Sequence, residues 1–181
     1  MKKDYIEFLQ KKQIAIENSG FDLMDSEMNE NLFPFQKYCV KRAVKAGRFA
    51  MFEDCGLGKT LQQLEWAYQV QKHLNQPVLI LAPLGVIGQT ILEGVKFGYD
   101  VKEIGLTVFD QDLQAGIYIT NYDNMDNIDA YLFGGVVLDE SSILKNFNGK
   151  TRNELIIAFK DTKYKLCCTA TPSPNDTTEL C

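Results

Sequence analysis

Apolar residues recur along this chain with two different spacings, and the spacing divides it into helices and strands. Residues 2–19 carry apolar side chains every three or four positions, and so do the stretches 34–47, 59–74, 85–97 and 151–160. This spacing predicts amphipathic helices. Short continuous apolar runs predict strands at 49–52, 78–82, 106–109, 117–120, 135–138 and 164–169.

From residue 49 onward the strands alternate with helices, and this order indicates an α/β fold. Strands that are apolar on both faces need helices on both faces, because each face must be kept from water. The pattern predicts a three-layer αβα domain with a mostly parallel central sheet over residues 33–181. Residues 1–32 combine a helix with the acidic, aperiodic stretch 22–32, and we expect them to form an N-terminal helical extension and connector.

Composition narrows the class of protein. The 181 residues are 45% hydrophobic and 24% charged, which suits one globular domain. The net charge of −5 argues against a bulk electrostatic nucleic-acid binder, although it permits local contacts with nucleic acid. No apolar run approaches the roughly 20 residues that cross a bilayer, so we expect no membrane contact. The five cysteines lack metal-type spacing and indicate free thiols in a reducing compartment, so we expect a cytoplasmic protein.

A glycine-rich segment, Gly56-Leu57-Gly58-Lys59-Thr60, lies between a strand and a helix. Glycines let the backbone approach an anion closely, and the helix N-terminus adds partial positive charge. In this layout the lysine would reach the β- and γ-phosphates, and the threonine hydroxyl would ligate Mg²⁺. The segment therefore predicts a nucleoside triphosphate site, although Glu53 stands where the general pattern has a further glycine. The alternative is an ordinary glycine turn before a helix.

Two acids, Asp139 and Glu140, follow the strand 135–138. A strand end is rigid and can place a carboxylate accurately, so Asp139 is expected to hold Mg²⁺ and Glu140 to orient or deprotonate the attacking water. The alternative is a solvated strand end. Thr169 and Thr171 follow another strand, and their hydroxyls can hydrogen-bond these acids if the two strands are neighbours.

Six segments in chain order resemble motifs of the first RecA-like domain of superfamily-2 helicases and translocases. The resemblance is to the branch with chromatin remodellers and phage-encoded DEAD-like helicases. The segments are Phe35-Gln36, Glu53 through Thr60, Ala82-Pro83-Leu84 with Gln89, Ile119-Thr120-Asn121-Tyr122, Asp139-Glu140-Ser141-Ser142 and Thr169-Ala170-Thr171-Pro172. They cover about residues 33–176. The resemblance also suggests a phage or mobile-element origin, and with it the cytosol of a bacterium or a phage-infected host.

The resemblance implies a motor domain that binds ATP and Mg²⁺ and hydrolyses ATP. It implies that Gln36 reads the adenine, that Lys59, Asp139 and Glu140 are catalytic, and that Thr60 and Asp139 hold the metal. It also implies coupling through Thr169 and Thr171. The residues expected to bind nucleic acid, with DNA favoured over RNA, are Pro83, Gln89, Thr120, Asn121 and Tyr122, of which Tyr122 would stack on a base.

The resemblance also implies a partner. In this family a second RecA-like domain supplies arginine fingers and half of the nucleic-acid track, and the 181 residues hold only the first domain's motifs. We therefore expect the chain to hydrolyse ATP very slowly by itself. The segment Asp139-Glu140-Ser141-Ser142 departs from the D-E-A-D pattern after its two acids, which affects expectations for coupling but not for the metal chemistry.

Two other functions remain open from the residues. One is a non-catalytic module that senses ATP or acts as a scaffold, and the presence of Glu140 argues against it. The other is a small-molecule kinase, which would need an arginine-rich lid, whereas the arginines are Arg42, Arg48 and Arg152. The single histidine, His73, lies near a predicted helix end and is expected at the surface or as a helix cap.

Overall fold

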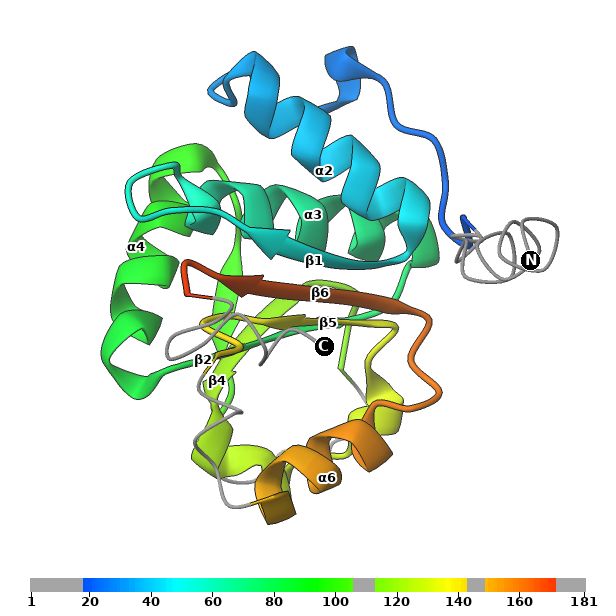
Figure 1. Cartoon of the computed structure of the whole chain (residues 1–181), viewed down its shortest axis with the longest axis vertical. Coiled ribbons are helices and arrows are strands. Elements are labelled where there is room, and N and C mark those ends of the chain that lie inside the picture. Colours follow the sequence, from blue (N-terminus) through cyan, green and yellow to red (C-terminus); the bar gives the residue numbers. More distant parts are fainter. Residues whose placement is uncertain (1–17, 106–112, 143–148, 172–181) are drawn as a thin grey trace, which may run out of the picture.

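The computed structural model of the chain describes residues 18–105, 113–142 and 149–171 (Figure 1). Its helices are α2 (Pro34–Ala46), α3 (Lys59–Leu74), α4 (Ile87–Phe97) and α6 (Gly149–Ala158). Its strands are β1 (Arg48–Phe52), β2 (Val78–Ala82), β3 (Val101–Glu103), β4 (Ile117–Asn121), β5 (Gly135–Leu138) and β6 (Tyr164–Thr169). Short 3₁₀ turns are η1 (Asp25–Glu27), η2 (Leu84–Val86), η3 (Tyr122–Asn127) and η4 (Ala130–Leu132).

All six described strands form one sheet in the order β1-β6-β5-β2-β4-β3, and every neighbouring pair is parallel. Parallel strands end at the same edge of a sheet, so the loops that follow them meet there. In particular, β5 lies between β2 and β6, and β1 lies beside β6. This arrangement confirms the predicted parallel α/β sheet.

Alternation along β2 shows how the sheet separates two apolar layers. Val78, Ile80 and Ala82 pack into the larger core cluster with α2, α3 and α4, whereas Leu79 and Leu81 pack with α6 and the turns η3 and η4. Every residue of β2 is buried, as expected of a central strand covered on both faces. Figure 1 shows α2 and α3 on one side of the strands and α6 on the other.

Element bounds agree with the sequence pattern except at the sheet edge. The strand β3 (Val101–Glu103) was not expected, because its three residues include two exposed charged side chains and carry no apolar run. The strand predicted at 106–109 lies outside the described residues, as does almost all of the helix predicted at 2–19. Neither of these two predictions is tested.

The stretch 22–32, expected as a connector, contributes to the core. Leu23, Met28 and Leu32 are buried within the larger apolar cluster. Asn29 donates its backbone N–H to the buried carboxylate of Glu65 on α3 (3.1 Å) and its side-chain amide to the carbonyl of Phe97 (2.8 Å). The boundary predicted between residues 32 and 33 therefore does not coincide with a break in packing.

His73 is exposed in the last turn of α3, where its ring stacks on Phe21 with centroids 3.9 Å apart. In the described parts of the chain, no helix combines the length and apolar character that a membrane span requires.

Candidate functional site

The glycine-rich loop joins β1 to α3, and two of its residues have backbone conformations that favour glycine. Gly56 and Gly58 have φ of 85° and 75°, in the left-handed region that side chains disfavour. A Cβ on Gly58 would also lie 2.5 Å from the amide nitrogen of Gln36. Both glycines are thus needed for the shape of the loop, and α3 begins directly after the second one, at Lys59.

Lys59 closes the loop on itself. Its ammonium donates to the backbone carbonyls of Glu53 (2.8 Å) and Asp54 (2.9 Å). These carbonyls satisfy a charge that a phosphate oxygen could satisfy better, since hydrogen bonds between ionised groups are the stronger ones. The lysine therefore lies in the loop, where an anion could replace the two carbonyls as the acceptor of its hydrogen bonds.

Asp139 follows β5, and the parallel register brings it to the edge of the sheet that carries the loop. Its backbone N–H donates to the carbonyl of Leu81 (2.8 Å), and its Oδ1 accepts from the Gln63 amide (2.6 Å). Burial raises the pKa of the Asp139 carboxyl above its ordinary value, and the charge of Lys59 acts in the opposite direction. Gln63 lies one turn after Lys59 on α3, so its bond to Asp139 brings the lysine and the acid, 80 positions apart along the chain, to the same region of the site.

Glu140 occupies a left-handed backbone conformation, with φ of 49°, which is unusual for a residue with a side chain. Its neighbour Ser141 holds this turn, because both its N–H (2.9 Å) and its hydroxyl (3.2 Å) donate to the carbonyl of Cys168. The turn sends two successive carboxylates in different directions, toward Gln63 for Asp139 and toward β6 for Glu140.

The two predicted threonines lie beside Glu140 because β6 is the neighbour of β5. The Oε1 atom of Glu140 accepts from the hydroxyl of Thr169 at 2.8 Å and, at the long distance of 3.5 Å, from that of Thr171. Ser142 donates to the same oxygen (2.6 Å). The hydroxyls contact Glu140, and the structure gives no hydrogen bond from them to Asp139. A coupling role for the threonines stays a prediction.

Gln36 is only 4% exposed, and its side chain supports the glycine-rich loop. Its Nε2 donates to the carbonyl of Leu57 (2.8 Å), and its oxygen accepts from the N–H of Phe33 (2.9 Å). One hydrogen and one lone pair of the amide remain for an adenine edge, so the predicted role in base reading would be additional to this contact. The rings of Phe33 and Phe35, next to it in the chain, stack on one another at the surface.

Two of the residues predicted to bind nucleic acid are buried, and for them the prediction is wrong. Tyr122 is 5% exposed and donates its hydroxyl to the carbonyl of Asp139 (2.6 Å), so its ring is not available for stacking on a base. Thr120 is 1% exposed and donates to the carbonyl of Ile104 (3.2 Å). Both side chains instead support the loops at this edge of the sheet, a purpose that strand-end polar residues commonly serve.

The other three candidates lie nearer the surface. Asn121 accepts from the N–H of Asn124 (3.0 Å) and so caps the turn η3. Gln89 is exposed on α4 and bonds only Glu93 on the same helix, at 3.3 Å. Pro83 is partly exposed after β2. A role for these three in binding nucleic acid stays a prediction.

Residues of α3 that the sequence analysis did not single out also belong to the site. Gln63 is bonded to Asp139, and Gln62 donates to the Glu53 carboxylate (2.6 Å) and, more weakly, to the Leu57 carbonyl (3.4 Å). Both glutamines are essentially buried, and Gln62 Oε1 has no hydrogen-bond partner. The sequence feature that could have indicated them is a pair of adjacent glutamines between apolar residues, in the first turns of a predicted helix.

Glu53, at the position where the general pattern has glycine, is part of this contact network. Its carboxylate receives the Gln62 amide. Burial, followed by the charge of Glu53, raises the pKa of the nearby Cys39 thiol. The substitution of glycine by glutamate therefore ties the loop to α3 and to α2.

Comparison with known proteins identifies relatives of this arrangement. The family described as SNF2-related domain matches residues 36–181. The chain is 29% identical over 169 residues to the SWI/SNF-related matrix-associated actin-dependent regulator of chromatin subfamily A-like protein 1 of Xenopus tropicalis, covering 87% of this chain and 17% of that protein. It is also 29% identical over 170 residues to protein p41 of Acyrthosiphon pisum secondary endosymbiont phage 1, covering 81% of this chain and 37% of p41.

Solved structures share the fold. The UvsW helicase from bacteriophage T4 matches with a TM-score of 0.68 at 18% identity, over 99% of this chain and 64% of that one. The Sulfolobus solfataricus SWI2/SNF2 ATPase core in complex with dsDNA matches with a TM-score of 0.64 at 24% identity, over 88% of this chain and 36% of that one. The chain thus spans less than a fifth of the frog protein and little more than a third of the archaeal core.

Proposed function

Since this chain belongs to the SNF2-related domain family, we propose that it is the first lobe of an ATP-dependent DNA translocase or helicase. In this role it binds ATP with Mg²⁺ and hydrolyses ATP when a second RecA-like lobe completes the site. The observation that carries the proposal is the meeting of Lys59, Asp139 and Glu140 at one edge of a parallel sheet, beside a loop that begins a helix.

The residues present fit a magnesium ion that arrives with the nucleotide. Asp139 has one oxygen bonded to Gln63, and a carboxylate has further lone pairs with which it can bind a metal ion. Thr60 is the second residue of α3, and its hydroxyl would be the other protein ligand of the ion. When bound, the ion would neutralise phosphate charge.

The chain's own groups supply the remaining chemistry. The N–H groups of the loop and the start of α3 bind phosphate oxygens, and Lys59 transfers its hydrogen bonds from the loop carbonyls to them. Glu140 accepts a proton from, or orients, the attacking water. The hydroxyls of Thr169 and Ser142 hold its carboxylate in place for this purpose. Retention of this acid favours a motor over a non-catalytic sensor.

The test is binding of a fluorescent ATP analogue to the 181-residue chain with and without Mg²⁺. Lys59→Ala should weaken binding by at least about a hundredfold, because the lysine carries the main cationic contact with the β- and γ-phosphates. Lys102→Ala, which removes an exposed lysine of β3, is the matched control and should leave affinity unchanged. Equal affinity in wild type and Lys59→Ala would refute the proposed site.

Turnover separates the motor from the sensor. Hydrolysis by the chain alone should be very slow, since a second lobe with an arginine finger contributes roughly 10³–10⁵ in rate in related phosphoryl-transfer enzymes. Addition of a family second lobe and duplex DNA should raise the rate. ATP binding with no turnover under any of these conditions would instead support the sensor.

A further inference from the structure

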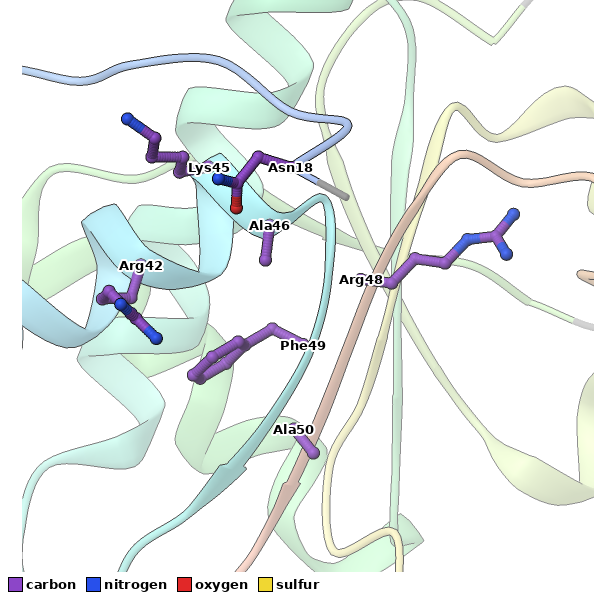
Figure 2. A pocket seen from close by; sticks show the side chains of 7 residues that line it. All are labelled: Asn18, Arg42, Lys45, Ala46, Arg48, Phe49 and Ala50. Carbon is purple, nitrogen blue, oxygen red and sulfur yellow. The ribbon is translucent and has the colours of Figure 1, made fainter. Parts of the chain in front are cut away.

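The polar groups at the two ends of the sheet are arranged differently. Beside the start of β1, the side chains around a pocket diverge, since Phe49 and Arg42 point between strand and helix while Arg48 points to the other side (Figure 2). At the carboxyl ends of the strands, polar groups from β2, β6 and the turn η3 instead converge on Asp139 and Glu140. This second arrangement is the one that can hold chemical groups in fixed positions.

Glu140 has an unfavourable backbone conformation at a position proposed to act in catalysis. Its φ of 49° lies in the left-handed region, which disfavours residues that carry a side chain. Such a conformation persists only where the neighbouring groups fix it. The groups that fix it are therefore candidates for a role in placing the Glu140 carboxylate.

Hydrogen bonds hold the peptide groups on both sides of Glu140. Before it, the Asp139 carbonyl accepts from the Tyr122 hydroxyl at 2.6 Å. After it, the Ser141 N–H (2.9 Å) and hydroxyl (3.2 Å) both donate to the Cys168 carbonyl. The orientation of the preceding peptide group sets φ of Glu140 and that of the following one sets ψ, so these bonds restrain both dihedral angles.

The side chain of Glu140 depends on the same backbone geometry. Its Oε1 accepts from the hydroxyls of Thr169 (2.8 Å) and Ser142 (2.6 Å). Reversal of the peptide group between Asp139 and Glu140 would change φ of Glu140 and rotate the carboxylate away from these two donors. The Tyr122 hydroxyl opposes that reversal, because the carbonyl that accepts its proton would turn away.

Burial makes the Tyr122 hydroxyl a dependable donor. Tyr122 is 5% exposed and is the first residue of η3, directly after β4. Burial, followed by the charge of Asp139, raises the pKa of the hydroxyl, so it stays protonated. Water competes little for a hydrogen bond in such surroundings, and the bond to the Asp139 carbonyl therefore restrains the turn more firmly than an exposed bond would.

We propose that Tyr122 is a positioning residue for ATP hydrolysis. It acts through the backbone of Asp139, keeps Glu140 in its left-handed conformation and so keeps the carboxylate directed at the attacking water. The inference rests on the proposed function, because only there does Glu140 act on water. Tyr122 needs no contact with the nucleotide or the metal for this role. The position of η3 and the direction of the Glu140 carboxylate are thereby linked.

Hydrogen exchange of the 181-residue chain without nucleotide gives the first readout. Tyr122→Phe removes the hydroxyl and keeps the ring. Tyr118→Phe is the matched control, because Tyr118 is also a buried tyrosine whose hydroxyl donates to a backbone carbonyl, that of Gln114 at 3.1 Å. Exchange at the Ser141 N–H should be at least about tenfold faster in Tyr122→Phe than in Tyr118→Phe, because only the first variant releases the turn.

Turnover in the presence of the second lobe and duplex DNA gives the second readout. Tyr122→Phe should lower kcat at least about tenfold and change KM by less than about threefold, because the Lys59 loop that binds the nucleotide is untouched. Ser141→Ala removes a donor on the other side of Glu140 and should lower kcat in the same way. The double variant should lose less than the product of the two single losses, since both bonds hold one turn.

The two readouts distinguish failure of this proposal from failure of the proposed function. If the wild-type chain binds no ATP, the proposed function fails, whereas selectively faster exchange at Ser141 still supports the control of Glu140 by Tyr122. If ATP is hydrolysed and the exchange rates at Ser141 are equal in Tyr122→Phe and Tyr118→Phe, the proposed function stands and the positioning role is overturned. A raised KM with unchanged kcat in Tyr122→Phe would overturn it as well.

Discussion

The helix α3 carries two groups of buried polar residues that bond different parts of the chain. In its first turns, Gln62 and Gln63 bond to Glu53 and Asp139 at the nucleotide edge of the sheet. Further along, the Glu65 carboxylate accepts from Gln69 (2.7 Å), from Asn29 and from Tyr99. The residue types and the degree of burial are nearly the same in both groups.

The two groups differ in how completely their polar atoms are satisfied. Both oxygens of Glu65 are used, one by Gln69 and the other by the Tyr99 hydroxyl and the Asn29 N–H. In the first group, Gln62 Oε1 has no partner among the described residues, and the Asp139 carboxylate has lone pairs to spare beside its bond to Gln63. A complete network stabilises packing, whereas one with spare capacity is suited to a ligand.

The largest effect should come from the complete network. Glu65→Leu leaves the buried Tyr99 hydroxyl and the N–H of Asn29 without an acceptor, and should lower the free energy of unfolding by about 3 kcal/mol. Urea denaturation measures the change, and Glu103→Leu at the exposed edge is the control, with a change within about 0.5 kcal/mol. ATP affinity of the folded fraction should be unaffected. A parallel loss of affinity would show that the two groups of α3 are not separate.

The incomplete network should respond in the opposite way. Gln63→Leu removes the side-chain donor that Asp139 has among the described residues, so it should weaken Mg²⁺-dependent ATP binding by about tenfold, the usual effect of losing a group that orients a metal ligand. The free energy of unfolding should change by less than about 1 kcal/mol. Gln71→Leu, on the same helix, is the matched control. Unchanged Mg²⁺ dependence in Gln63→Leu would remove this glutamine from the site.

The smallest effect should be a gain in stability from Asp139→Asn. Because burial raises the pKa of Asp139, the folded state is penalised for carrying this charge, and a neutral amide of the same shape relieves the penalty. We expect a gain of roughly 0.5–1 kcal/mol at pH 7, together with loss of Mg²⁺-dependent ATP binding.

The pH dependence of that gain has a definite sign. For an acid whose folded pKa is raised, wild-type stability falls as pH rises from the ordinary pKa through the raised one. Asp139→Asn lacks this loss, so the stability difference should vanish in strong acid, grow through that window and stay constant above it. Urea denaturation of both proteins across pH 3–8 measures it, and a constant difference at all pH values would contradict the account.

Much of the fold could be predicted from spacing alone. The strands 78–82, 135–138 and 164–169 and the helix 59–74 have the predicted bounds. Each is long and apolar enough for its local pattern to determine whether it forms a strand or a helix. The strand β3 could not be predicted, because its three residues, two of them charged, form a strand only by pairing with β4. The buried role of residues 23–32 likewise depends on Glu65, which lies more than thirty positions away.

The site was predictable to the extent that a motif's chemistry is carried by adjacent residues. The lysine, the two acids and the two threonines were recognisable from their positions after a loop or strand. The positions of Tyr122 and Thr120 were not, since the sequence does not say whether a polar side chain at the end of a strand faces solvent or is buried beneath the loop that follows. The hydroxyl of Tyr122 donates to the Asp139 carbonyl, and that contact depends on which strands are neighbours in the sheet.

The order of residues by itself determined a parallel α/β domain, the glycine loop with its lysine, and an acidic pair at a strand end, because each depends on local periodicity or on adjacent groups. Only the tertiary structure decided which of these groups meet. The register of β5 against β2 and β6 brings Glu140 to Thr169 and Asp139 to Gln63 and Lys59. The order of the strands also decided that β6, and with it the two threonines, lies between β1 and β5, since hydrogen bonding between distant segments is settled by the packing of the whole chain.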